Sequence, residues 1–149
     1  MEKSVHTLAE FEAEAARFTG SLALSARATL ITLSGELGAG KTAFTKAVAS
    51  ALGVEGIVNS PTFVLEKIYL LPPKLGGKTS KFRRLIHIDA YRLSKGSELA
   101  PLGFDELMRD ASNLILLEWP EKVSDALPIP AAHISLVASP DGSRMISYG

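Results

Sequence analysis

The sequence predicts a three-layer α/β fold with a mostly parallel central sheet and a C-terminal hairpin. Apolar runs of strand length, such as "LIHID" and "NLILLE", alternate with segments of helical periodicity. A further apolar run, "TLITL", leads directly into a glycine-rich loop. The length of 149 residues suits one domain with a sizeable core. We therefore expect a single domain over residues 1–149.

The composition is that of a soluble globular protein. Hydrophobic residues make up 46% of the chain, and 16 basic residues balance 16 acidic ones, which argues against an extended nucleic-acid-binding surface. The absence of cysteine excludes disulfides and cysteine-based zinc sites. No apolar run approaches the about 18 residues of a membrane span, and the N-terminus lacks the apolar run of a signal peptide. We expect a cytoplasmic protein that does not enter a membrane.

The first predicted element is a helix from Thr7 to about Phe18. Its apolar residues recur at helical spacing, and they are Leu8, Phe11, Ala15, Phe18 and Leu22. Thr7 and Glu10 have the spacing of a capping box. A buried strand follows over Thr29–Leu33 and runs into the glycine loop.

The segment "KTAFTKAVASALG" after the loop predicts a second helix. Phe44, Val48 and either Ala51 or Leu52 would lie on its inner face, and Gly53 would end it. "NSPTF" then predicts a loop and "FVLEKIYL" a strand. The Pro-, Gly- and Lys-rich segment "LPPKLGGKTSKFRR" predicts a long loop or the tip of a hairpin.

The second half of the chain alternates in the same way. Leu85–Asp89 predicts a strand, and "SELAPLGFDELMRD" a helical segment broken near Pro101 and Gly103. Asn113–Glu118 is a continuous apolar run and predicts a central parallel strand. "WPEKVSDALP" predicts a loop with a short helical turn, and "HISLVAS" and "RMISYG" a terminal hairpin.

The glycine loop contains the pattern G-x-x-x-x-G-K-T, formed by Gly35, Gly40, Lys41 and Thr42. Glycines let backbone N–H groups surround an anion, and the following helix places its positive end at the phosphates. Lys41 would reach the β- and γ-phosphates, and the Thr42 hydroxyl would bind Mg²⁺. The strand–loop–helix context favours a P-loop NTPase-like fold that binds ATP. The nucleotide-binding residues predicted from the loop are Glu36, Leu37, Gly38, Ala39, Gly40, Lys41, Thr42 and Ala43.

Two carboxylates end predicted strands, namely Asp89 and Glu118. The carboxyl ends of parallel strands are where open α/β sheets bind ligands, and a P-loop enzyme needs an acid there to hold Mg²⁺. One of the two would hold the metal. The other would orient or deprotonate the attacking water, or hold an arginine in place.

Other polar and aromatic residues are weaker candidates. Thr62 lies where P-loop switches place a residue that senses the γ-phosphate and Mg²⁺, although Ser-Pro-Thr is also a common turn. His87 is expected to be a packed, hydrogen-bonded core residue. Tyr91 and Arg92 would either contact phosphate or a partner, or close the strand end. Trp119 is a candidate for an interface.

The ordered set "SGELGAGKT", "SPTF", "HIDAYRL", "LGFDEL" and "LLEWPEKV" resembles the bacterial TsaE family, formerly called YjeE. The resemblance covers about residues 7–128. It implies a small P-loop ATPase of tRNA threonylcarbamoyladenosine synthesis. Such a protein works with TsaD and TsaB, whose complex modifies N6 of an adenosine beside the anticodon. Its ATP hydrolysis would support repeated turnover, with tRNA contact indirect or weak.

The resemblance also implies roles for individual residues. Lys41 and Asp89 would be catalytic, and Thr42, Thr62 and Glu118 would form the metal site. The region that includes Thr7 would lie near the adenine, and Trp119 in a functionally sensitive loop.

The sequence departs from the family pattern in four places. The family commonly has Asp at position 36 and a hydroxyl residue at position 43, where this chain has Glu36 and Ala43. Ala43 removes a hydroxyl near the α-phosphate and would weaken nucleotide affinity modestly. Ala90 replaces a larger apolar residue. The basic loop over residues 74–84 is longer than the common form and would be a neutral insertion or a contact to tRNA or a partner.

Two further functions fit the same loop. A small-molecule or nucleotide kinase would need an arginine-bearing lid, for which Arg83 and Arg84 are candidates. A non-catalytic module would bind nucleotide without turnover. A GTPase is disfavoured because the chain has no N-K-x-D guanine signature.

Overall fold

The computed structural model describes residues 1–55 and 65–149. The described residues form a seven-stranded sheet in the order β1-β9-β8-β2-β7-β6-β3. The strands are β1 (Glu2–Val5), β2 (Thr29–Ser34), β3 (Glu66–Leu70), β6 (Arg84–Asp89), β7 (Asn113–Glu118), β8 (Ala132–Ala138) and β9 (Arg144–Tyr148). The four central strands β8, β2, β7 and β6 run parallel, whereas β1, β9 and β3 pair in antiparallel fashion. The predicted mixed α/β fold, mostly parallel sheet and C-terminal hairpin are confirmed.

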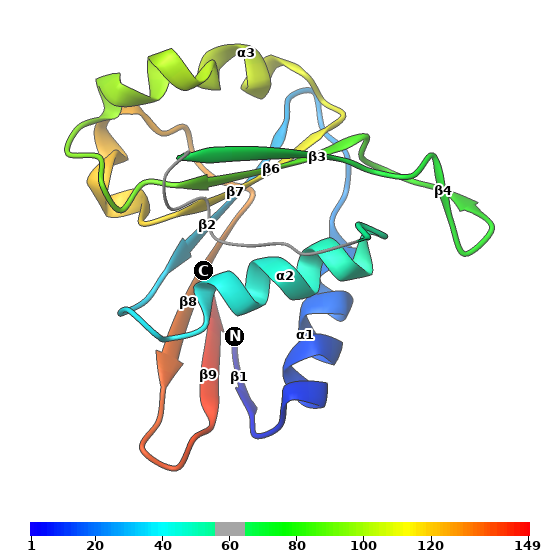
Figure 1. The fold of residues 1–149 in the computed structure, drawn as a ribbon, viewed down its shortest axis with the longest axis vertical. Coiled ribbons are helices and arrows are strands. Elements are labelled where there is room, and N and C mark those ends of the chain that lie inside the picture. Colours follow the sequence, from blue (N-terminus) through cyan, green and yellow to red (C-terminus); the bar gives the residue numbers. More distant parts are fainter. Residues whose placement is uncertain (56–64) are drawn as a thin grey trace.

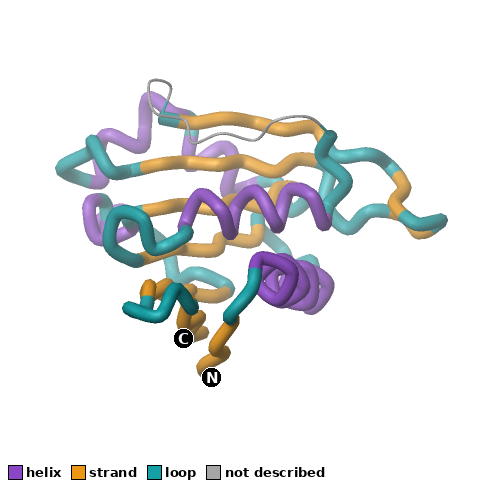
Figure 2. Tube along the Cα trace, turned by 60° about the horizontal axis from the view of Figure 1, so that its bottom comes forward, coloured by secondary structure: helices purple, strands orange, loops and turns teal. Residues whose placement is uncertain are grey.

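Helices cover both faces of the sheet (Figures 1 and 2). Helices α1 (Leu8–Ser21) and α2 (Lys41–Ala51) pack together on one face. There the centroid of the Phe44 ring lies 5.9 Å from that of Phe11 and 6.0 Å from that of Phe18. The other face carries the 3₁₀ helix η1 (Gly96–Leu102) and helix α3 (Phe104–Arg109). Two short 3₁₀ turns, η2 (Pro120–Lys122) and η3 (Ser124–Ala126), follow β7.

Strand β7 lies at the centre of the core, as its apolar run predicts. All six of its residues are buried, between β2 and β6. Alternation sends Leu114 and Leu116 to the cluster under α1 and α2, and Ile115 and Leu117 to the cluster under η1 and α3. A strand that is apolar on both faces therefore needs helices on both faces.

Three local features differ from the sequence predictions. Strand β1 was not anticipated, because "EKSV" has neither the length nor the alternation of a predicted strand. Leu8 is 69% exposed and does not join the core. Thr7 caps α1 by accepting from Glu10 N at 3.1 Å, but Glu10 accepts from His6 N and so completes no reciprocal capping box. By contrast, the basic segment forms a small hairpin of β4 (Lys74–Leu75) and β5 (Lys78–Thr79), which agrees with the predicted hairpin tip.

The remaining boundaries agree with expectation. The break near Pro101 and Gly103 separates η1 from α3. The predicted loop "NSPTF", with Thr62, lies outside the described residues. None of the helices in the described ranges is both long enough and apolar enough to cross a membrane.

Candidate nucleotide-binding site

The glycine loop connects β2 to α2, and its glycines adopt conformations that other residues rarely reach. Gly35 and Gly40 have φ of 152° and 111°. A β-carbon at Gly35 would lie 2.5 Å from the Leu136 carbonyl oxygen, so β8 leaves no room for a side chain there. The loop then closes with a bond from Phe44 N to Gly40 O at 2.8 Å. The motif spacing therefore reflects backbone conformation and close packing.

Lys41 is the first residue of α2, and it is only 5% exposed. Its Nζ donates hydrogen bonds to Gly35 O at 2.5 Å and Glu36 O at 2.9 Å. The same ammonium lies 4.3 Å from the centroid of the Trp119 ring, a cation–π contact. The lysine is thus folded back onto the loop, held by carbonyls and by the residue that follows β7.

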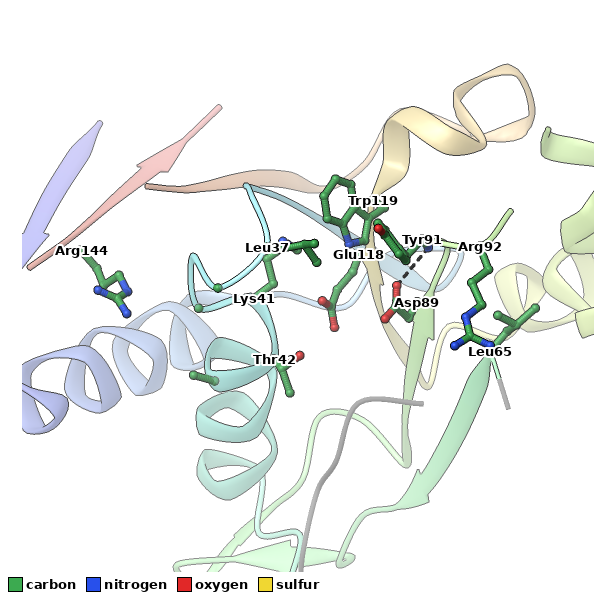
Figure 3. Close-up of a pocket in the computed structure, with 13 residues that line it drawn as sticks. Leu37, Lys41, Thr42, Leu65, Asp89, Tyr91, Arg92, Glu118, Trp119 and Arg144 are labelled. Carbon is green, nitrogen blue, oxygen red and sulfur yellow. Dashed lines mark hydrogen bonds between the residues drawn. The ribbon is translucent and has the colours of Figure 1, made fainter. Parts of the chain in front are cut away.

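Asp89 and Glu118 end the neighbouring parallel strands β6 and β7, where they are paired in register. Alternation along each strand places both carboxylates on the sheet face that α2 covers, the face that also receives Leu85 and Leu116. Figure 3 shows both side chains directed toward the beginning of α2. The sequence argument that strand ends bring these acids together is supported by this arrangement.

Glu118 is 2% exposed and forms a hydrogen bond through Oε2 to His87 Nε2. His87 is fully buried, and its Nδ1 has no hydrogen-bond partner within the described residues. The expectation that His87 is a packed, hydrogen-bonded core residue is confirmed. The sequence did not indicate that its partner is the candidate metal ligand. A buried ring nitrogen on one carboxylate oxygen fixes the orientation of that carboxylate.

Trp119 follows Glu118 in a left-handed conformation, with φ of 61° and ψ of 52°. It is the only non-glycine residue with positive φ in the described chain. Its backbone N–H donates to Leu33 O at 3.1 Å, and its ring lies 5.1 Å from that of Tyr91. Tyr91 N in turn donates to Asp89 Oδ1 at 3.0 Å. The backbone turn at Trp119 therefore places the indole over Lys41.

The glycine loop, α2 and the strand ends enclose one open cavity of about 500 Å³ at the carboxyl ends of the parallel strands. Its lining residues are Leu37, Gly38, Gly40, Lys41, Thr42, Ala43, Leu65, Asp89, Tyr91, Arg92, Glu118, Trp119 and Arg144. The cavity brings together the loop, the first turn of α2 and the ends of β6 and β7. It therefore gathers most of the site residues that the sequence singled out.

Three predicted residues lie elsewhere. Glu36 and Ala39 line a separate hollow of about 330 Å³ between the loop and β8. Thr7 lines a second cavity of about 230 Å³, formed by residues 5–8 with Phe11, Gly40, Ala43, Gly142 and Arg144. Thr62 falls outside the described residues. The roles assigned to these four positions remain predictions.

Sequence reasoning missed Leu65 and Arg144. Leu65 precedes β3, and Arg144 begins β9, about a hundred residues from the glycine loop. Neither was predicted as a site residue, although Leu65 lies in the segment "FVLEKIYL", and the pairing of strands distant in sequence brings both to the cavity. The sequence therefore carried no local signal for either residue.

The donor set suits a hard divalent cation bound together with phosphates. The Thr42 hydroxyl and the Asp89 and Glu118 carboxylates are oxygen donors in the same cavity, and Mg²⁺ prefers oxygen ligands and few protein ligands when it accompanies phosphates. No group of three or more His, Cys, Asp or Glu suited to a metal occurs among residues 1–55 and 65–149. The cation Lys41 supplies a partner for phosphate charge.

Comparison with known proteins identifies the family. The model of the threonylcarbamoyl adenosine biosynthesis protein TsaE matches residues 5–146. This chain belongs to the TsaE family. TsaE proteins take part in tRNA threonylcarbamoyladenosine biosynthesis, so the resemblance found in the sequence motifs is confirmed.

Individual TsaE relatives agree with this assignment. The TsaE of Streptomyces coelicolor is 45% identical over 62% of this chain and 57% of its own length. That of Bacillus subtilis is 38% identical over 80% of this chain and 68% of its own length, and that of Rickettsia conorii 34% identical over 96% and 76%. The chain thus matches little more than half of the Streptomyces relative. The crystal structure of Bacillus subtilis YdiB superposes with a TM-score of 0.73 at 29% identity, covering 99% of this chain and 83% of YdiB.

Proposed function

We propose that this TsaE-family protein is an Mg²⁺-dependent P-loop ATPase that supports the TsaD–TsaB complex in forming N6-threonylcarbamoyladenosine in tRNA. The observation that carries the proposal is the single cavity that Lys41, Thr42, Asp89 and Glu118 share. A cation, a hydroxyl and two carboxylates in that cavity are the groups that ATP hydrolysis in P-loop enzymes requires.

Each of these residues has a distinct task in the proposed reaction. Lys41 leaves its carbonyl partners and neutralises the β- and γ-phosphates, while the first turn of α2 directs its positive end at them. Thr42 and Glu118 would hold Mg²⁺, which would supply positive charge to offset the charge that develops on the phosphates. Asp89 orients or deprotonates the attacking water. Thr62 is proposed as the switch residue near the metal.

The second cavity supports a position for the adenine. It adjoins the first at Gly40 and Ala43, and its wall includes the apolar Val5 and Phe11 together with Thr7. Leu8 is 69% exposed at this cavity, so a flat apolar base would cover a side chain that the core leaves in water. We therefore assign the base to this cavity and the phosphates to the larger one.

Indirect or weak contact with tRNA accords with the charges of the basic segment. Two of its cations have partners within the fold, because Lys81 Nζ donates to Leu22 O at 2.7 Å and Arg84 pairs with Asp110 at 3.1 Å. The balanced overall charge also provides little of the phosphate neutralisation on which nucleic-acid affinity depends. The proposed setting is the cytoplasm, with TsaD and TsaB as direct partners.

Phosphate release tests the function. The protein is incubated with ATP and Mg²⁺, alone and with TsaD and TsaB, and free phosphate is measured. We expect slow hydrolysis alone and faster hydrolysis with the pair, and we expect pull-down of the pair to differ between ATP and ADP. Transfer of the γ-phosphate to a small molecule would instead indicate the kinase alternative. Tight ATP binding without hydrolysis in any mixture would indicate a non-catalytic module.

A further inference from the structure

Arg144 lies where the two cavities of the proposed nucleotide site meet. Gly40, Ala43 and Arg144 line both cavities. A β-carbon built on Gly40 would lie 3.7 Å from Arg144 Nε, so the guanidinium borders the last glycine of the loop. In Figure 3, Arg144 approaches the loop from the side opposite to Asp89, Glu118 and Trp119.

The strand pairing fixes this approach. Arg144 is the first residue of β9, where it pairs with Ala138 of β8 and Val5 of β1. Its Nη1 donates to Gly142 O at 3.2 Å and to Ser143 O at 3.5 Å. The arginine is thus anchored in the C-terminal hairpin, with one edge of its guanidinium bonded to that hairpin.

The electrostatic environment of Arg144 favours an anion beside it. Within the described residues, no carboxylate forms an ion pair with this guanidinium. Its neighbour, Gly40, is the N-cap of α2, so the positive end of an eleven-residue helix faces the same space. A cation beside a helix N-terminus is repelled unless a negative group lies between them.

We propose that Arg144 binds the α-phosphate of the nucleotide. This inference rests on the proposed function, because a nucleotide with its base in the smaller cavity and its β- and γ-phosphates at Lys41 must pass its α-phosphate along the shared wall. At that wall Ala43 offers only a methyl group, so Arg144 supplies the charged side-chain donor. The C-terminal hairpin is then part of the nucleotide site, and the loss of a hydroxyl at position 43 is offset from β9.

The test compares nucleotide affinities of Arg144 variants in the full chain. Binding of ATP and of ADP, each with Mg²⁺, is measured by calorimetry for Arg144→Gln, Arg144→Met and Arg144→Lys. Because ATP and ADP share the α-phosphate, Arg144→Gln and Arg144→Met should weaken the affinity for both nucleotides by the same factor of about ten, the size expected for a half-exposed charged hydrogen bond. The affinity of Arg144→Lys should stay within about threefold of the wild-type value, because this variant keeps the positive charge.

The matched control is Arg27→Gln, an exposed arginine that precedes β2 and lines neither cavity. It should bind both nucleotides with wild-type affinity. Thermal unfolding of every variant separates a lost contact from a damaged fold, and Arg144→Met preserves the aliphatic stem if Arg144→Gln does not fold. Wild-type affinity in both Arg144→Gln and Arg144→Met, or a loss of affinity confined to ATP, would overturn the assignment of Arg144 to the α-phosphate. A wild-type chain that binds neither nucleotide would instead refute the proposed function.

Discussion

Glu14 and Glu118 are both buried carboxylates, 4% and 2% exposed, yet their surroundings differ. Glu14 lies on α1 and meets three partners from three elements. Arg17 donates to its two oxygens at 2.8 and 2.6 Å, the Tyr148 hydroxyl donates to one of them, and Lys3 lies 3.6 Å away. Within the described residues, the Glu118 carboxylate has one hydrogen-bond partner, His87, whose second ring nitrogen has no partner there.

These surroundings suit the two carboxylates to different roles. The partners of Glu14 hold its pKa down to about 2, chiefly through the Arg17 hydrogen bonds, and so stabilise the charge within the fold. That network ties α1 to β1 and β9 and opens onto neither cavity. Glu118 lines a cavity beside Lys41, with few partners and a strained neighbour at Trp119. A buried charge with many partners stabilises the fold, whereas one with few partners at a cavity is available for a ligand.

The largest expected effect comes from removing the cation in the cavity of Glu118. Lys41→Ala should weaken ATP binding about a hundredfold or more, because the β- and γ-phosphates lose their charged partner. Lys46→Ala, on the exposed face of the same helix, should bind normally. Calorimetry with ATP and Mg²⁺ measures both, and equal affinities would refute the P-loop assignment.

Glu118→Gln tests whether the carboxylate at the cavity serves a ligand rather than the fold. The amide keeps a hydrogen bond to His87 but loses the charge for Mg²⁺, so hydrolysis should fall about tenfold to a hundredfold while ATP still binds. The free energy of unfolding should change by less than about 1 kcal/mol. Phosphate release and urea unfolding measure the two effects. Normal hydrolysis would direct the same test to Asp89→Asn.

Glu14→Gln should give the opposite pattern. The neutral amide weakens the bonds from Arg17 and Tyr148, so unfolding should cost about 1–3 kcal/mol less, while the rate of ATP hydrolysis per folded molecule stays unchanged. Glu12→Gln, on the exposed side of α1, is the control and should alter neither quantity. A loss of hydrolysis in Glu14→Gln without a loss of stability would show that Glu14 serves the reaction rather than the fold.

The smallest effect is the pH dependence of the Glu14 network. Because the pKa of Glu14 is lowered from 4.5 to about 2 in the fold, its contribution to stability is present above pH 4.5 and is lost as the pH falls toward 2. Burial also raises the pKa of Tyr148 above 10.0, so its contribution is present below pH 10 and fades as the pH rises beyond it. The stability difference between wild type and Glu14→Gln should therefore shrink below pH 4.5 in urea titrations. A difference that is constant down to pH 2 would show that the charge of Glu14 is not what stabilises the network.

The sequence predicted the elements whose signals are local. The run Asn113–Glu118 indicated a central parallel strand because its four consecutive apolar residues, Leu114–Leu117, fit few other environments. The glycine pattern predicted the loop, and the strand-end rule placed Asp89 and Glu118 at one cavity. These features depend on residues adjacent in the chain or on a topology that parallel strands impose.

Features that arise from distant pairing could not be predicted in this way. Strand β1 exists because β9 offers it an edge, and "EKSV" alone has no strand pattern. Leu8 has the periodicity of a core residue, yet it occupies the first turn of α1, where the cavity rather than the core lies beside it. The hydrogen bond between His87 and Glu118 likewise follows from the register of β6 with β7, and the position of Arg144 from the pairing of β9 with β8 and β1.

The close contact at Gly35 has a mechanical consequence. The Leu136 carbonyl leaves no space for a β-carbon at that glycine, so any side chain there must displace β8. Strand β8 is paired to β9 at five successive positions, the last of which joins Ala138 to Arg144. A methyl group added at residue 35 would therefore displace β8 and, through its pairing, β9. The glycine loop and the C-terminal hairpin are therefore coupled through this one backbone contact, and a side chain at residue 35 would disturb both.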